Sequence, residues 1–377
     1  MMKRAVFISL GLFPCPDCRT APEVRAWQNL LALRELGIET TIVTTSDPLN
    51  RTIPDFPVVF APPLPETHFV QFHRQLQYRR TVAALVARQA RENDAFLFCE
   101  HWAALASAPR HPRIVYSCHD LERNLGRLRR LVKLNSAITV KMRLHWWLTE
   151  FLEDCLFKKV NRAICVSASE ALTVEARWGI PVEYIPIVPS GSVTEPPAAL
   201  NPALRFWFYG SSGATSNKII LDHLARELYL LLKQANPRAE FHQAGNYTTD
   251  TPEKIEWLQR HFTVHGFVDN PAKLFQRGDF CLIPYPYDTG FRTKIPEVCG
   301  YGMIPVGYPM TFACCPEMRD GYNCVVADTP RALAMKLASV ANDDTQRARL
   351  AAGAIETRRQ NFSSAALLDK YRHILNF

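Results

Sequence analysis

The fold is indicated most clearly by the stretch Tyr285-Pro-Tyr-Asp-Thr-Gly-Phe-Arg-Thr-Lys-Ile-Pro-Glu-Val-Cys-Gly-Tyr-Gly-Met-Ile-Pro-Val-Gly-Tyr-Pro-Met310 and the residues just before it. Before it, residues 279–284 (Asp-Phe-Cys-Leu-Ile-Pro) have the length and bounding residues of a buried strand. Within it, a helical pattern runs from near Arg292 to about Gly300, and residues 304–307 form a second apolar run. The stretch therefore predicts a strand, a turn at Gly290, a short helix and another strand.

Such a turn has a recognisable chemistry. In an open parallel sheet it lies at the carboxyl ends of the strands, where ligands bind and a helix N-terminus offers N–H groups to an anion. Arg292 and Lys294 place two cations there, and Glu297 follows one helical turn later. Two cations and a carboxylate fit a sugar nucleotide, which presents a diphosphate and ribose hydroxyls. The alternative is a surface helix whose Lys294–Glu297 pair is worth roughly 0.2–0.5 kcal/mol.

At these positions the chain resembles the retaining glycosyltransferases of the GT-B fold, family 4, also called glycosyl transferases group 1. The residues in register with its Glu-x7-Glu motif are Gly290, Arg292, Lys294, Glu297, Gly302 and Ile304-Pro-Val306. Thr289 replaces the first glutamate of the motif, with Asp288 beside it. The resemblance implies an α/β fold of two Rossmann-like domains facing each other across a cleft, with a C-terminal helix that crosses back to the N-terminal domain.

Length and composition agree with two domains, since 377 residues exceed what one core usually supports. The Pro- and Ser-rich run between Val188 and Pro202 indicates a linker. We therefore expect an N-terminal acceptor-binding domain (1–190), a linker (191–204), a C-terminal nucleotide-sugar-binding domain (205–360) and a final helix (361–377) that packs on the N-terminal domain.

The donor site is expected in the second domain. A strand from Arg205 to Gly210 leads into a Gly/Ser loop without a Walker lysine, and Lys218 is the loop's only nearby cation. Phe267 matches the turn where the family packs the base, or it fills the core. The resemblance implies donor-binding roles for Gly210, Ser211, Phe267, Thr289, Gly290, Phe291, Arg292, Lys294 and Glu297. No Asp-x-Asp pair occurs, so neither a metal nor another cofactor is expected.

His119 directly follows a predicted strand, residues 113–118, and precedes Asp120. A lone histidine at this place is either a structural strand-end residue or a group that faces the cleft. The resemblance favours the second reading and places His119 near the transferred sugar. It also implies transfer with retention, in which Arg292 and Lys294 stabilise the departing diphosphate and the leaving phosphate takes the acceptor proton.

The loop from Pro14 to Ala21 has no glycine, unlike the family's first loop, and Arg19 is a candidate to supply charge toward the acceptor. Cys15 and Cys18 form a C-x-x-C, but a structural zinc needs four ligands and only Cys118 and His119 are plausible completers. Eleven cysteines, several inside predicted strands, indicate free thiols in a reducing cytoplasm. Unligated loop thiols are therefore expected.

Between Arg123 and Trp147 the chain has seven Lys or Arg residues, no acidic residue and many aliphatic ones. This composition suits a segment lying on an anionic membrane, at about 1 kcal/mol per cation. A solvated helix face and a phosphate-tracking surface for nucleic acid are the alternatives. The residues assigned to the acceptor or membrane are Arg19, Arg127, Arg130, Lys133, Trp146 and Trp147.

No apolar run reaches the length of about 18 residues that a membrane span needs. The start of the chain mimics a signal peptide, but a buried strand from Val6 to Phe13 is the better interpretation. We therefore expect a cytoplasmic enzyme, peripheral on the inner face of the membrane, that glycosylates a glycan or lipid-linked acceptor in polysaccharide or glycoconjugate synthesis. A transferase for DNA bases or other non-lipid acceptors, a sugar-nucleotide epimerase and a non-catalytic relative are the alternatives.

Overall fold

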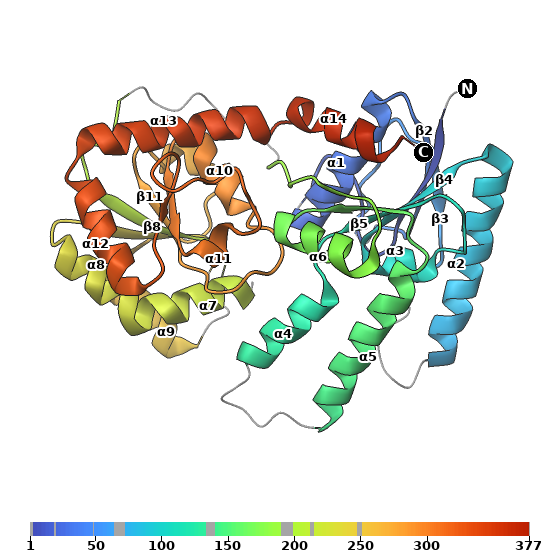
Figure 1. Cartoon of the computed structure of the whole chain (residues 1–377), viewed down its shortest axis with the longest axis horizontal. Coiled ribbons are helices and arrows are strands. Elements are labelled where there is room, and N and C mark those ends of the chain that lie inside the picture. The colour runs from blue at the N-terminus through green and yellow to red at the C-terminus, as the bar shows by residue number, and fades with distance from the viewer. Residues whose placement is uncertain are drawn as a thin grey trace. The chain divides into compact units, whose positions relative to one another are not determined.

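A computed structural model of the chain describes residues 3–18, 20–47, 49–63, 72–132, 140–189, 199–211, 215–246 and 251–376. The chain divides into two compact units (Figure 1). The first contains Met1–Ser190, Thr289–Phe291 and Ser364–Phe377, and the second contains Gly191–Asp288 and Arg292–Ser363. Each unit is described by itself below.

The described residues of the first unit form a seven-stranded parallel sheet in the order β3-β2-β1-β4-β5-β6-β7. The strands are β1 (Arg4–Ser9), β2 (Glu39–Thr44), β3 (Val58–Phe60), β4 (Phe96–Glu100), β5 (Ile114–Cys118), β6 (Arg162–Cys165) and β7 (Val182–Tyr184). The central strands are buried on both faces, which explains their continuous apolar sequence. Because the order reverses between β1 and β4, the carboxyl ends of these strands form a topological switch point.

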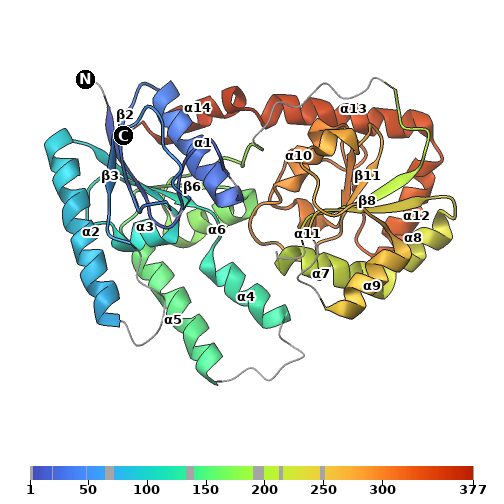
Figure 2. The same ribbon diagram turned by 180° about the vertical axis from the view of Figure 1, so that it is seen from behind.

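Helices cover both faces of this sheet. They are α1 (Ala21–Glu35), α2 (Phe72–Asn93), α3 (His101–Ser107), α4 (Glu122–Val132), α5 (Val140–Phe157), α6 (Ala168–Trp178) and α14 (Ser364–Ile374). On one face, α1 and α14 pack on a core that includes Phe7 and Phe98. On the other, α2, α3, α6 and the end of α5 pack on a core that includes Ile8. Figures 1 and 2 show α1 and α14 on the same side of the sheet, opposite α2.

The N-terminus of α1 shows how the sequence fixes a helix start. The Thr20 side chain accepts a hydrogen bond from the Glu23 backbone N–H, and the Glu23 carboxylate accepts one from the Thr20 N–H. This capping box satisfies two of the N–H groups that a helix start leaves free, and Pro22 fits the first turn. The position of α1 matters because it carries Arg25, Gln28 and Asn29 into the interior of the unit.

In the second unit the described residues form a six-stranded parallel sheet in the order β10-β9-β8-β11-β12-β13. Its strands are β8 (Arg205–Tyr209), β9 (Glu240–Ala244), β10 (Thr263–Val264), β11 (Phe280–Ile283), β12 (Ile304–Gly307) and β13 (Val325–Val326). The order again reverses, between β8 and β11. Both units therefore have the strand order of dinucleotide-binding α/β folds.

The helices of the second unit are α7 (Thr215–His223), α8 (Tyr229–Ala235), α9 (Pro252–His261), α10 (Lys294–Gly300), α11 (Pro309–Phe312), α12 (Pro330–Ala341) and α13 (Asp344–Asn361). The longest, α13, packs against α10, and α12 packs against α8. Figure 1 shows α13 lying next to α10 along one side of the sheet. The segment that carries the predicted donor residues is thus supported by a long helix of its own unit.

The predicted α/β class with two parallel sheets is confirmed, and the last helix, α14, belongs to the first unit as expected. Several boundaries were wrong. The first strand ends at Ser9 rather than Phe13, and β10 ends at Val264 rather than Phe267. The helix expected from Arg292 begins at Lys294. Among the described residues, no helix combines the length and apolar character that spanning a bilayer requires.

Candidate functional site

Two sets of polar side chains lie at the carboxyl ends of the strands, one at each switch point. In the second unit the set is built around β8, which ends at Tyr209 and Gly210. Gly210 has φ +138°, and a Cβ there would lie 2.5 Å from the Asn217 side-chain nitrogen. Only glycine therefore allows the end of β8 to approach α7 this closely.

Lys294 lies at the centre of this set. Its ammonium donates hydrogen bonds to the Tyr209 carbonyl oxygen at 2.5 Å and to Asn217 Oδ1 at 2.7 Å. A lysine has three N–H donors, so within the described part of the chain these two bonds leave one for a ligand. Burial lowers the pKa of Lys294 to about 8, and the nearby Arg292 charge acts in the same direction. An anion at the remaining N–H would offset that penalty.

Glu297 lies one turn further along α10, where its carboxylate accepts a hydrogen bond of 2.7 Å from the Tyr209 hydroxyl. Burial raises the pKa of Glu297 above its usual range, while the Tyr209 hydroxyl and the Lys294 ammonium oppose this shift. The hydroxyl orients one carboxylate oxygen of Glu297. The structure therefore brings Lys294 and Glu297 together and adds Tyr209 and Asn217 to them.

Other predicted donor residues of this unit lie around the same strand ends. The Arg292 guanidinium carbon lies 3.8 Å from the centroid of the buried Tyr285 ring, a cation–π contact. Ser211 follows Gly210 and is exposed. Phe267 is 76% exposed, so the alternative that it fills the core is wrong. An exposed aromatic ring at a strand end is suited to stack against a nucleotide base.

Residues Thr289, Gly290 and Phe291 belong to the first unit. Thr289 and Gly290 are buried, and the Gly290 N–H donates a 3.3 Å hydrogen bond to Glu170 Oε1. Gly290 has φ +59°, and any Cβ there would collide with the Asp120 carboxylate. Burial and the Asp120 charge raise the pKa of Glu170 to about 7. The turn thus packs on two carboxyl groups rather than offering all its amides to an anion.

His119 and Glu100 form the second set, at the carboxyl ends of β5 and β4 in the first unit. The Nε2 atom of His119 is in direct contact with Glu100 Oε1, and both side chains are buried. Asn29, from α1, donates a 2.6 Å hydrogen bond to the other carboxylate oxygen of Glu100. Glu100 therefore lies at the switch point between β1 and β4, and His119 lies beside it at the end of β5. The sequence did not predict this acidic partner of His119.

The residues assigned to the acceptor or membrane differ in their placement. Arg127 is exposed on α4, beside an open groove of about 680 Å³ between α4 and α6. Trp147 is 59% exposed, but Trp146 is 5% exposed, so the prediction that both tryptophans share a surface is wrong. Arg130 lies in α4, and its side chain is outside the described set. Arg19 and Lys133 lie outside the described residues.

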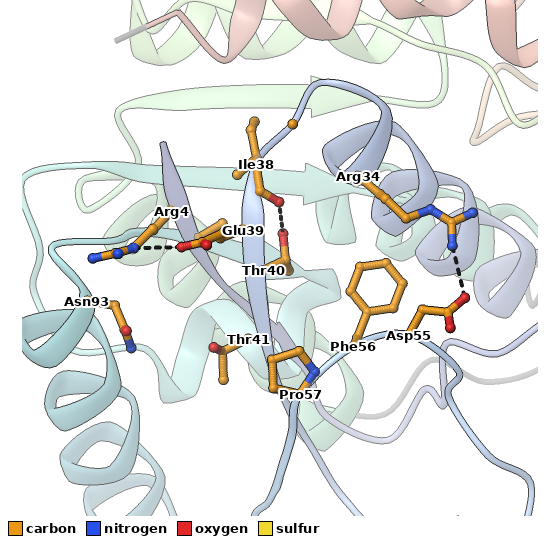
Figure 3. A pocket seen from close by; sticks show the side chains of 12 residues that line it. Arg4, Arg34, Ile38, Glu39, Thr40, Thr41, Asp55, Phe56, Pro57 and Asn93 are labelled. Atoms are coloured by element: carbon orange, nitrogen blue, oxygen red, sulfur yellow. Dashed lines mark hydrogen bonds and ion pairs between the residues drawn. The ribbon is translucent and has the colours of Figure 1, made fainter. Parts of the chain in front are cut away.

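A further pocket of about 420 Å³ lies at the opposite edge of the first sheet. It is lined by residues near the amino ends of β1 and β2, where Arg4 pairs with Glu39 and Arg34 with Asp55 (Figure 3). Ligands of parallel α/β sheets bind at the carboxyl ends, so this pocket is not the candidate site.

The cysteines carry no metal centre in the part of the chain that the structure describes, where no group of three or more potential ligands gathers. The Cys18 thiol donates to the Cys15 carbonyl oxygen at 2.8 Å, and all eleven cysteines are free thiols. Burial raises the pKa of Cys18 to about 12. The Cys15 and Cys18 side chains are thus close to each other on this loop, with the Cys18 thiol in its neutral form.

Tyr209, Asn217, Glu100 and Asn29 complete the two sets but were not predicted. Tyr209 and Glu100 had a usable signal, because each is a polar residue that ends an apolar run of strand length. For Asn217 and Asn29 there was none, since a polar residue in an amphipathic helix is ordinary. The two asparagines become visible only when the strand order is known.

Comparison with known proteins agrees with this arrangement. A model for Glycosyltransferase Family 4 matches residues 23–195, and one for Glycosyl transferases group 1 matches residues 204–343. No curated protein matches the chain in sequence.

Among solved structures, the chain is similar to sucrose-phosphate synthase from Thermosynechococcus elongatus, with 12% identity, a TM-score of 0.68 and 98% of each chain covered. It is also similar to HepE from Anabaena in complex with UDP-glucose, with 14% identity and a TM-score of 0.62. The lipopolysaccharide outer core galactosyltransferase WaaB has 13% identity and a TM-score of 0.67. The last two similarities cover 99% of each chain. The chain is therefore a glycosyltransferase of the GT-B fold, in which a Glycosyltransferase Family 4 domain is followed by a Glycosyl transferases group 1 domain.

Proposed function

We propose that this glycosyltransferase transfers a sugar, with retention and without a metal, from a nucleoside-diphosphate sugar to a glycan or lipid-linked acceptor. The observation that carries the proposal is the cluster at the end of β8. There a half-buried lysine, with one N–H unused among the described residues, lies beside a carboxylate oriented by a tyrosine. These groups match a diphosphate oxygen and the ribose hydroxyls, respectively.

The roles follow from the charges. Lys294 and Arg292 stabilise the negative charge that grows on the leaving diphosphate, so a divalent cation is not needed. Glu297 accepts hydrogen bonds from the ribose, and Phe267 stacks on the base. The departing phosphate removes the acceptor proton, and therefore the protein need not supply a strong base. Support for a uridine nucleotide comes from HepE, whose structure contains UDP-glucose.

The acceptor is proposed to reach the first unit from a membrane surface. On α5, Leu144, Trp147, Leu148 and Phe151 are exposed at helical spacings of three and four residues, and Trp147 stacks on Phe151 with centroids 5.8 Å apart. Figures 1 and 2 show α5 extending beyond the sheet of its unit. An exposed aromatic stripe in a segment rich in arginine and lysine is suited to the interface of an anionic bilayer.

This placement favours a lipid-linked acceptor and a role in cell-surface polysaccharide or glycoconjugate synthesis on the cytoplasmic side of the membrane. The similarity to WaaB, described as a lipopolysaccharide outer core galactosyltransferase, supports an acceptor of this class. The open groove beside Arg127 offers a cation to an anionic acceptor headgroup.

The donor can be identified by thermal unfolding of the full chain against UDP-, ADP-, GDP- and TDP-sugars, because a specific ligand raises Tm with the logarithm of its occupancy. The best donor is then incubated with lipid extracts, and the anomeric configuration of the product is read by NMR. Product made in EDTA with the donor's configuration supports the proposal. Inverted product or a metal requirement contradicts the mechanism. Donor conversion without any acceptor would instead favour an epimerase.

The membrane part has its own test. Flotation with vesicles containing about 30% anionic lipid should retain the protein, and Trp147→Ala with Phe151→Ala should weaken binding by roughly ten-fold or more, since each ring buries apolar area in the interface. Met335→Ala is the matched control, because Met335 is an exposed apolar residue on α12 of the second unit. Equal losses in both variants would contradict a specific α5 contact.

A further inference from the structure

A continuous path of buried hydrogen bonds crosses the first unit from the residues before the linker to His119. At one end, the Val188 N–H donates to Gln28 Oε1 at 2.9 Å, and Gln28 Nε2 donates to the Pro186 carbonyl at 3.0 Å. Because backbone groups have fixed donor and acceptor roles, these two bonds fix the orientation of the Gln28 amide. The same Nε2 donates to the Tyr371 hydroxyl at 3.2 Å.

The hydrogen bonds of Tyr371 continue in the same direction, from donor to acceptor. Its oxygen accepts from Gln28 and, at 3.4 Å, from the buried Arg25 guanidinium, which can only donate. The Tyr371 proton is therefore directed to its remaining neighbour, Asn29 Oδ1, at 2.5 Å. With Oδ1 facing Tyr371, the NH₂ group of Asn29 faces Glu100 Oε2 at 2.6 Å.

Glu100 receives donors on both carboxylate oxygens. Oε2 accepts from Asn29, and Oε1 accepts from the Ser117 hydroxyl at 3.1 Å and is in contact with His119 Nε2. Burial alone would raise the pKa of Glu100, but the Arg25 charge and the Asn29 hydrogen bond act in the opposite direction and favour the ionised carboxylate. An ionised carboxylate only accepts, so the His119 nitrogen that touches it must carry a proton.

In neutral His119 the other ring nitrogen, Nδ1, then carries a lone pair that can accept a hydrogen bond. Among the residues that the structure describes, Nδ1 of His119 has no hydrogen-bond partner. The His101 ring packs edge-on against the His119 ring, with centroids 5.3 Å apart. Burial lowers the pKa of His101 to about 4, so this neighbour is neutral at pH 7 and adds no competing charge.

We propose that Glu100 is a positioning residue, oriented through Asn29 by Tyr371 of the C-terminal helix, that fixes His119 with its proton on Nε2. His119 then presents Nδ1 as a hydrogen-bond acceptor at the carboxyl ends of β4 and β5. The effect of this tautomer on turnover rests on the proposed function, whereas the tautomer itself does not.

The tautomer can be measured in the full chain without any ligand, by ¹⁵N NMR of the histidine rings at pH 8. The His119 signals are assigned by their loss in His119→Gln. The expected result is a protonated Nε2 and a bare Nδ1. A proton on Nδ1 in the wild type would overturn the proposal, and this outcome needs no other variant.

Glu100→Gln gives the sharper test. Because Tyr371 keeps the Asn29 NH₂ group pointed at residue 100, the new carbonyl must face Asn29 and the new NH₂ must face His119. The ring must then accept at Nε2, so its proton should move to Nδ1. Adding Tyr371→Phe to this variant lets Asn29 rotate and should return part of the population to the Nε2–H form. An unchanged tautomer in Glu100→Gln would overturn the relay.

The functional statement is tested with the identified donor. Glu100→Gln should lower kcat by about ten-fold or more while KM for the donor changes less than about three-fold, because nucleotide binding is left intact. Ser117→Ala is the matched control, since it removes one donor to Glu100 but keeps the charge and the tautomer. Unchanged kcat in a variant whose tautomer has switched would refute the role of Nδ1 and leave the proposed transferase function standing.

Discussion

The low pKa of Lys294 makes donor binding sensitive to pH in a defined direction. The ammonium is half-buried and donates to Tyr209 and Asn217, and desolvation lowers its pKa to about 8. At pH 7 about nine-tenths of the free enzyme carries the charge, and at pH 9 only about one-tenth does. If only the charged form binds the diphosphate, the apparent Kd should rise about ten-fold between pH 7 and pH 9.

The assay is calorimetric titration with the identified nucleotide sugar, whose diphosphate diester keeps a constant charge over this range. Lys294→Met is the matched control, since it preserves the length of the side chain and removes the titrating group. The variant should bind more weakly at pH 7, turn over more slowly and show no slope between pH 7 and pH 9. A wild-type Kd that is flat to pH 9 would refute the assignment of Lys294 to the diphosphate.

Stability should respond to the same group with the opposite sign. The folded pKa of about 8 lies below the ordinary lysine value of 10.5, so between these values the unfolded chain binds more protons than the native one. The contribution of Lys294 to the free energy of unfolding therefore rises with pH through that window. The Tm of the wild type minus the Tm of Lys294→Met should therefore increase from pH 8 to pH 10, while the affinity of the wild type for the donor falls.

Two further predictions concern the carboxylates of Glu297 and Glu170. Glu297→Ala should weaken donor binding by roughly 1.5–3 kcal/mol, the usual value of hydrogen bonds to a charged group. Tyr209→Phe should weaken it less, because only the orientation of Glu297 is lost. Calorimetry of both variants checks this order, and equal affinity of the wild type and both variants would contradict the ribose role. Glu170→Gln should reduce the dependence of Tm on pH between about pH 4.5 and pH 7. The pKa of Glu170 is raised to about 7 from an ordinary 4.5 by burial and by the Asp120 charge, so wild-type Tm falls as pH rises from about 4.5 to 7, and the amide removes that fall. A wild-type slope that survives in Glu170→Gln would show that another group causes it.

The fold followed from patterns that are local in sequence. Residues 280–283 and 304–307 were recognisable as buried strands because they are short apolar runs, and they form β11 and β12. The turn and helix between them were placed correctly to within two residues, since Gly290 and the spacing from Lys294 to Glu297 are local signals as well. Those features depend only on neighbours in the chain.

The parts of the site that could not be predicted depend on strand order. Lys294 bonds to Tyr209 and Asn217, which are 85 and 77 positions away, and Asn29 bonds to Glu100 across 71 positions. Such pairs meet because β8 lies next to β11, and β1 next to β4, which no periodicity records. Trp146 and Trp147 are a different case. Successive residues on a helix point about 100° apart, so the sequence alone predicts that Trp146 and Trp147 do not lie on the same face.

Each switch point holds one charged group away from bulk water, a cation in the second unit and an anion in the first. In the second unit a half-buried cation has two acceptors for three N–H groups among the described residues, so a ligand at the third should be an acceptor, such as an anion. In the first unit a buried anion has donors on both oxygens, so nothing more is needed at Glu100 and the unmet group is the Nδ1 lone pair of His119. Because a buried group without a partner costs free energy, each site gains from a ligand of one polarity only.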